Sequence, residues 1–170
     1  MNKLLVKDSN VSINNSYQNL EIKTSKLILN ISGSNTINDY DNNTDLDLKI
    51  IMKPHSKLLY NRKNANINNF TLDIEALSDS YIEFNYSLET SVASNIKLDA
   101  NISGNQNTSR INFHGVTKDE GLIKSIATSK VSENTKDNEI LENLRIIALN
   151  DTENEIVPNL LVRSDSVNAI

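Results

Sequence analysis

The chain contains no cysteine. This absence excludes disulfides, thiolate nucleophiles, Cys-ligated zinc and an iron–sulfur cluster held by the chain's own thiolates. There are only 4 glycines and 2 prolines, and no Asn-Gly, Asp-Gly or Gly-Gly dipeptide, so tight two-residue hairpins lack their preferred residues. Asn and Ser are abundant instead. Because Asn tolerates the left-handed backbone region, we expect wider turns built from these residues.

Long apolar runs and a net positive charge are also missing. The first apolar run is Leu4–Val6, which is shorter than the roughly 7–15 residues of a secretory signal, and no stretch approaches the roughly 18 needed to cross a bilayer. We therefore expect a cytoplasmic chain that does not contact membranes. The net charge of −5 disfavours nucleic acid as a partner, and the apolar fraction of 38% predicts a thin core.

Apolar and polar residues alternate along much of the chain, a period typical of half-buried strands. The runs with this period are 27–31, 46–50, 70–76, 82–88, 96–102 and 111–113. We predict that Leu72, Phe84, Leu98 and Phe113 point into the core. The segment 139–149 fits both a helix and a buried strand, and its Ile146-Ile147 pair and short length favour the strand.

The spacing of these strands predicts the fold class. Their centres recur every 12 to 15 residues, roughly, between positions 59 and 112, as in a sandwich or a solenoid. Without hairpin dipeptides, and with a thin core, we predict an all-β protein that forms a right-handed parallel β-helix of short strands. An antiparallel β-sandwich is the alternative. No linker composition divides the chain, so residues 1–170 are expected to form one domain.

Few residues suggest metal chemistry. Oxygen-bearing side chains alternate in Asp39–Asp47 as in an EF-hand loop, but Thr44 stands where the loop needs Gly and Ile50 where it needs Glu. We interpret this segment as a solvated acidic turn that leads into a strand. His55 and His114 lie 59 positions apart without nearby carboxylate motifs, so each is expected to be a satisfied or solvent-facing side chain.

Catalytic motifs are also missing. The pair Asp119-Glu120 precedes Gly121 and is interpreted as a charged turn, since adjacent side chains normally diverge. No phosphate loop, dinucleotide-binding motif or nucleophile elbow is present, and no spacing of carboxylates singles out a hydrolase site. We therefore predict no enzyme, no catalytic or metal-binding residue, and no cofactor bound by this chain alone.

Three segments carry a resemblance to a known family: Ile96–Gly104, Ile146–Asn150 and Val157–Ala169. In the last of them a Pro, an aliphatic strand and an Asp-x-Val-x-Ala turn follow one another, as they do before a His in the SufB/SufD family. The chain therefore resembles the core of this family of iron–sulfur cluster assembly components, over residues 45 to 170, roughly, in pattern. The resemblance implies a right-handed parallel β-helix.

The resemblance also implies a function. It points to a non-enzymatic scaffold component of a cytoplasmic SufBCD-type assembly system, and to SufD more than SufB, because the SufB pattern supplies a cysteine. The family's His and Cys, and the helices that dock the ATPase SufC, lie beyond the position of Ile170, so a SufC contact has no support. The chain is then a truncated SufD-like protein or a fragment, or a β-solenoid that has lost the activity.

The predicted partner surface is the last coil. Leu160, Leu161, Val162 and Val167 form a candidate interaction edge, which is expected to pair with a SufB-like subunit or to drive self-association. The alternative function is a β-solenoid binding module without an assembly role. A polymer-binding module would use a row of exposed aromatics, which an aromatic content of 5% without Trp makes hard to assemble.

Overall fold

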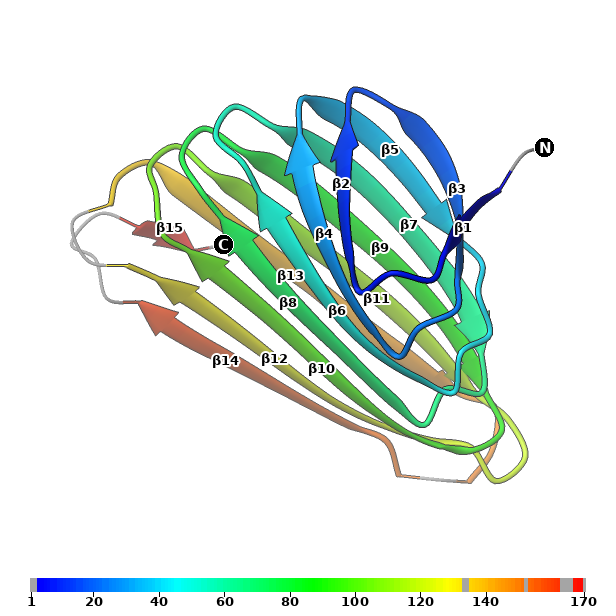
Figure 1. Ribbon diagram of the computed structural model, residues 1–170. Helices are drawn as coiled ribbons and strands as arrows, with labels where there is room; N and C mark the ends of the chain where they lie inside the picture. Colours follow the sequence, from blue (N-terminus) through cyan, green and yellow to red (C-terminus); the bar gives the residue numbers. More distant parts are fainter. Residues whose placement is uncertain (1–2, 133–134, 152, 163–166, 170) are drawn as a thin grey trace.

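The computed structural model describes residues 3–132, 135–151, 153–162 and 167–169, with side chains described as far as residue 157. All strand pairs in it are parallel, and consecutive strands alternate between two sheets (Figure 1). The chain therefore coils as a parallel β-helix. The predicted parallel β-helix is therefore confirmed, and the alternative, an antiparallel β-sandwich, is not the fold.

The eight-stranded sheet holds the odd-numbered strands. They are Leu4–Val6 (β1), Tyr17–Ile22 (β3), Ser34–Asp39 (β5), Lys57–Ala65 (β7), Tyr81–Thr90 (β9), Thr108–Thr117 (β11), Asn138–Ala148 (β13) and Val167–Ala169 (β15). The seven-stranded sheet holds the even-numbered strands. They are Asn10–Asn14 (β2), Lys26–Ser32 (β4), Asp45–Met52 (β6), Asn69–Ala76 (β8), Ala93–Ile102 (β10), Leu122–Val131 (β12) and Glu155–Val162 (β14). The segment 139–149, which sequence left between helix and strand, lies almost wholly in β13.

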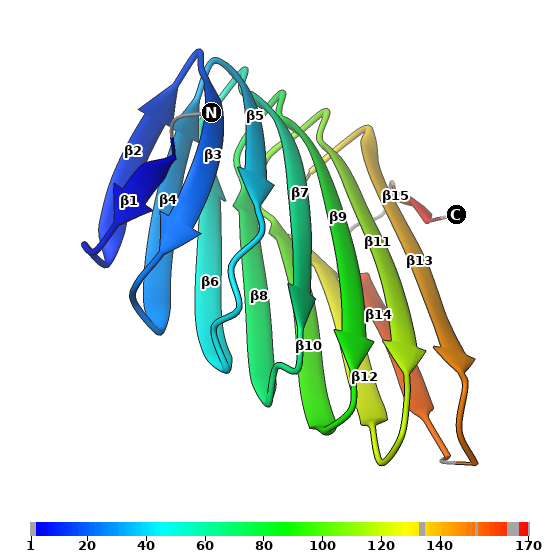
Figure 2. The same cartoon turned by 90° about the vertical axis from the view of Figure 1, so that its right-hand side faces the viewer.

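The coils widen along the chain. Asn19 and Asn38, which pair between β3 and β5, are 19 positions apart, whereas Asn112 and Asn143, which pair between β11 and β13, are 31 positions apart. Strand length rises from 3 residues in β1 to 11 in β13. The solenoid is therefore tapered, with a narrow end at β1 and β2 and a wide end at β13 to β15 (Figure 2).

The core lies between the two sheets and is filled by the inward side of each alternating run. Leu72, Phe84 and Leu98 are completely buried and Phe113 is almost so, as predicted. Aromatic rings connect successive coils: Phe84 stacks on Tyr60 at 5.0 Å between centroids, and Tyr86 contacts Phe113 at 5.3 Å. Each coil thus buries its apolar face against its neighbours, which lets a chain of modest apolar content form a continuous core.

Asn takes positive φ in the turns, as expected, although Asp does so at more positions. Asn15 and Asn66 have positive φ angles of 46° and 55°, and Asp79 and Asp119 adopt the same conformation. The Asn66 side chain also accepts a hydrogen bond from the backbone N–H of Ser91, one coil further on, at 2.8 Å. The turn residues therefore set the backbone bend and join neighbouring coils at once. None of the described residues forms a helix that is long and apolar enough to cross a membrane.

Candidate functional site

The wide end of the solenoid has an incompletely paired sheet edge. Strand β15 pairs only with Asn138, Glu139 and Ile140 of β13, so within the described residues the rest of β13 has no outer partner strand. Leu144 and Ile146 project inward from this part and are only half-buried, whereas Phe113, the register partner of Leu144 on β11, is 1% exposed. The edge therefore offers both backbone hydrogen-bonding groups and apolar surface.

The residues predicted to form an interaction edge belong to the same end. Leu160, Leu161 and Val162 lie in β14 and pair with Ser129, Lys130 and Val131 of β12, while Val167 begins β15. Both β14 and β15 are the outermost strands of their sheets. The backbone thus places the predicted residues at open sheet edges, and their side chains lie outside the described residues.

An asparagine ladder crosses the outer face of the eight-stranded sheet. Its rungs occupy one register row, and each donates from Nδ2 to Oδ1 of the rung before it, at 2.8 to 3.4 Å. The six rungs are Asn19, Asn38, Asn61, Asn85, Asn112 and Asn143. The ladder has one polarity and ends at the wide end, where Asn143 is exposed and its Oδ1 accepts no bond from a further rung among the described residues.

A single carboxylate faces inward near the wide end. Glu142 on β13 lies in register with Ile111 of β11, on the core side of the sheet, and accepts a hydrogen bond from the hydroxyl of Ser129 on β12. Burial raises the pKa of Glu142, and the Ser129 hydrogen bond opposes the rise. This carboxylate joins the two sheets across the wide end at a cost in desolvation.

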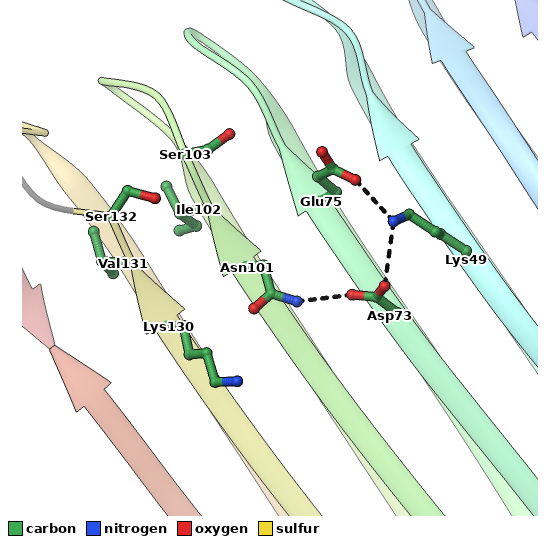
Figure 3. Close-up of a pocket in the computed structure, with 9 residues that line it drawn as sticks. All are labelled: Lys49, Asp73, Glu75, Asn101, Ile102, Ser103, Lys130, Val131 and Ser132. Carbon is green, nitrogen blue, oxygen red and sulfur yellow. Dashed lines mark hydrogen bonds and ion pairs between the residues drawn. The ribbon is translucent and has the colours of Figure 1, made fainter. Parts of the chain in front are cut away.

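A charged groove of about 630 Å³ lies on the outer face of the seven-stranded sheet (Figure 3). Lys49 on β6 contacts Glu75 at 2.9 Å and Asp73 at 3.5 Å, both on β8, and Asn101 on β10 donates to Asp73 at 2.8 Å. The hydrogen bond to Glu75 raises the pKa of the Lys49 ammonium group. Lys49 therefore offsets one of the two carboxylate charges, and Asn101 satisfies Asp73 by hydrogen bonding without neutralising it.

Strand register places a carboxylate pair that sequence spacing missed. Asp73 and Asp99 are direct register partners on β8 and β10, although they are 26 positions apart. Asp73 is held by Lys49 and Asn101, and Asp99 by Lys97 at 2.8 Å. Because each carboxylate has a cation beside it, the arrangement is that of a surface ion-pair network.

The acidic segment 39–47 differs from its sequence interpretation at its first residue. Asp39 is completely buried at the end of β5, where Arg62 of β7 and the hydroxyl of Tyr60 donate to its carboxylate. Burial raises the pKa of Asp39, and the Arg62 guanidinium opposes this rise. The prediction of a solvated turn is therefore wrong for Asp39, because the distant Arg62 supplies the countercharge, while Asp45 does begin strand β6 as expected.

The two histidines do not form a site. His55 is an exposed turn residue with φ 60°, and its Nδ1 lies 3.3 Å from Asp79. His114 is also exposed, inside β11 and not at its end. The described residues contain no group of three or more His, Cys, Asp or Glu that could hold a metal ion. Asp119 and Glu120 form the turn that sequence predicted.

Comparisons with protein-family models, with curated proteins and with solved structures find no match for this chain.

Proposed function

We propose that this chain is a non-enzymatic scaffold that binds a β-helical partner subunit through its wide end. The observation that supports the proposal is the uncovered part of β13, where an unpaired strand edge, half-buried Leu144 and Ile146, and the last rung of the asparagine ladder, Asn143, lie together. A strand added there gains backbone hydrogen bonds and buries apolar surface at the same time.

The taper restricts which surface fits this edge. A coil at the narrow end spans 19 positions between Asn19 and Asn38, whereas the last coil spans 31 between Asn112 and Asn143. Head-to-tail stacking of two copies would therefore join coils of unequal width. We infer that the partner presents a coil as wide as the last one, either in a second β-helical protein or at the wide end of a second copy.

The partner we propose is a SufB-like subunit, and the process is iron–sulfur cluster assembly. Support for this step comes from the sequence resemblance of segments such as Val157–Ala169 to the SufB/SufD family. The lack of cysteine fits a role in which the partner, and not this chain, supplies thiolate ligands. In this role the chain provides a rigid surface and no cluster ligands of its own.

Sedimentation velocity at several concentrations tests the proposal, with the chain alone and co-expressed with a SufB-like subunit. Ile146→Lys and Leu161→Lys should weaken association by about 1–3 kcal/mol, because they place a charge at the edge or remove apolar area there. Ile126→Lys is the matched control, since Ile126 is 47% exposed on β12, away from β13. Circular dichroism checks that each variant keeps its β-sheet signal.

The outcomes separate the two parts of the proposal. Association with the SufB-like subunit that the edge variants weaken and the control does not supports the assembly role. Self-association with the same dependence, without binding of the SufB-like subunit, supports the edge but contradicts the assembly role. A chain that stays monomeric with and without the subunit contradicts both.

A further inference from the structure

A row of cationic side chains lies on the outer face of the eight-stranded sheet, beside the asparagine ladder. Strand register aligns Lys63 of β7 with Ser87 of β9, Ser87 with His114 of β11, and His114 with Arg145 of β13. All four side chains are exposed. Neighbouring strands are about 4.8 Å apart, so the row runs across the strands, along the axis of the solenoid.

Among the described residues, the basic side chains of this row have no acidic partner. The ion pairs among the described residues use other basic groups, and Lys63, His114 and Arg145 take part in none of them. In the adjoining register row, Glu89 is paired with Lys118. Beyond the asparagine ladder, Glu83 takes part in no ion pair among the described residues and accepts a hydrogen bond from Asn85 at 3.3 Å. In a chain with a net charge of −5, an unneutralised row of this kind is a local positive patch.

The row borders a groove of about 720 Å³, which the asparagine ladder lines on the other side. Asn112 donates one Nδ2 hydrogen to Asn85 and accepts one from Asn143, both at 2.8 Å. An Asn side chain has two donor hydrogens and two acceptor lone pairs, so Asn112 keeps one of each for a ligand. The Ser87 hydroxyl adds a further donor and acceptor to the same groove.

We propose that this groove binds an acidic polysaccharide. The carboxamide, hydroxyl and imidazole groups suit the hydroxyls of a sugar chain. Arg145 in the groove suits a carboxylate or sulfate group, and Lys63, which lies beside the groove on β7, suits a second one further along the chain. The outward-facing side chains that line the groove are polar, and the groove is also lined by Tyr86, Phe113, Glu142 and Leu144, which belong to the core side of the sheet.

Nucleic acid fits this surface less well. Single strands are bound by stacking bases on aromatic side chains, and Tyr17 and Tyr40, the strongly exposed aromatics of the described chain, lie towards the narrow end and not in the groove. Lys63 and Arg145 are also too few cations to hold a duplex against the overall negative charge of the protein. Recognition here depends on charge and hydrogen bonding without aromatic stacking.

Isothermal titration calorimetry at low salt with a hexameric oligogalacturonate tests the proposal on the full chain. Arg145→Gln should weaken binding by about three- to tenfold, and adding Lys63→Gln should weaken it further, because each loses a charge-assisted hydrogen bond. Lys124→Gln is the matched control: it removes the same charge from an exposed lysine on the seven-stranded sheet, in register with Glu155 of β14. Its affinity should stay within about twofold of that of the parent.

Maltohexaose, a neutral sugar of equal length, should bind at least tenfold more weakly than the hexuronate, as expected if the charges contribute. The proposal is overturned if the hexuronate does not bind, if Lys124→Gln weakens binding as much as Arg145→Gln does, or if maltohexaose binds equally well. The proposal is also overturned if a single-stranded oligonucleotide of matched charge binds with equal affinity and responds in the same way to Arg145→Gln. The surface would then recognise negative charge without selecting for a sugar chain.

Discussion

Arg62 of β7 donates from Nη1 to Oδ2 of Asp39 on the neighbouring strand β5, and both side chains are completely buried between the two sheets. The guanidinium lies over the rings of Phe70 and Tyr86, with its central carbon 5.0 and 5.6 Å from their centroids. Its Nε and Nη2 have no hydrogen-bond partner among the described residues, so burying the pair carries a substantial desolvation cost. The two charges are therefore strongly dependent on each other.

Asp39→Asn should destabilise the protein by about 3–5 kcal/mol, because it leaves the Arg62 charge buried without a countercharge. Combining it with Arg62→Met should recover much of this loss, since the buried charge is then gone as well. Urea unfolding followed by circular dichroism measures both free energies. If the free energy of unfolding of Asp39→Asn alone stays within about 0.5 kcal/mol of that of the parent, Arg62 is solvated in solution and the buried ion pair is contradicted.

Asn112→Ala should lower the free energy of unfolding by about 1–2 kcal/mol. It removes two hydrogen bonds of the ladder, the one that Asn112 donates to Asn85 and the one that it accepts from Asn143. Asn143→Ala is the control within the same ladder. It removes one hydrogen bond at an exposed position, and should cost about half as much. Equal costs for the two variants in guanidinium unfolding would mean that the ladder contributes little beyond the strands themselves.

Glu142→Gln should stabilise the protein at neutral pH and not in acid. Burial raises the folded-state pKa of Glu142 above its ordinary value of 4.5, so its contribution to stability is complete below that value and is lost as the pH rises through the folded pKa. Gln keeps an oxygen that can accept from Ser129 but carries no charge. Thermal unfolding from pH 4 to 7 should show the advantage of the variant growing with pH. An advantage that is constant or shrinks as the pH rises would contradict a raised pKa.

The inward faces of the strands could be predicted from the sequence alone. In runs such as 70–76 and 96–102 the apolar residues alternate, and a shift of one residue would turn every apolar side chain towards water. The shortage of Gly and the abundance of Asn likewise predicted Asn at positive φ in the turns, as at Asn15 and Asn66, because φ > 0 is a local property of the residue. The predicted width was wrong for several turns: Gly33 alone separates β4 from β5, and residues 91–92 alone separate β9 from β10. Burial preference and turn conformation both act within a few positions, so no tertiary information was needed.

Pairing between coils was decided only by the tertiary structure. The ladder partners are 19 positions apart at Asn19 and Asn38 but 31 apart at Asn112 and Asn143, so the taper leaves no fixed period in the sequence from which to infer register. For the same reason the sequence around Asp39 did not predict its ion pair with Arg62, 23 positions away. The sequence around Lys63 likewise did not predict that Arg145 lies in the same row. Strand register determines which outward side chains become neighbours. In this chain the register depends on the length of each coil, and these lengths differ and are established only when the coils stack in the folded solenoid.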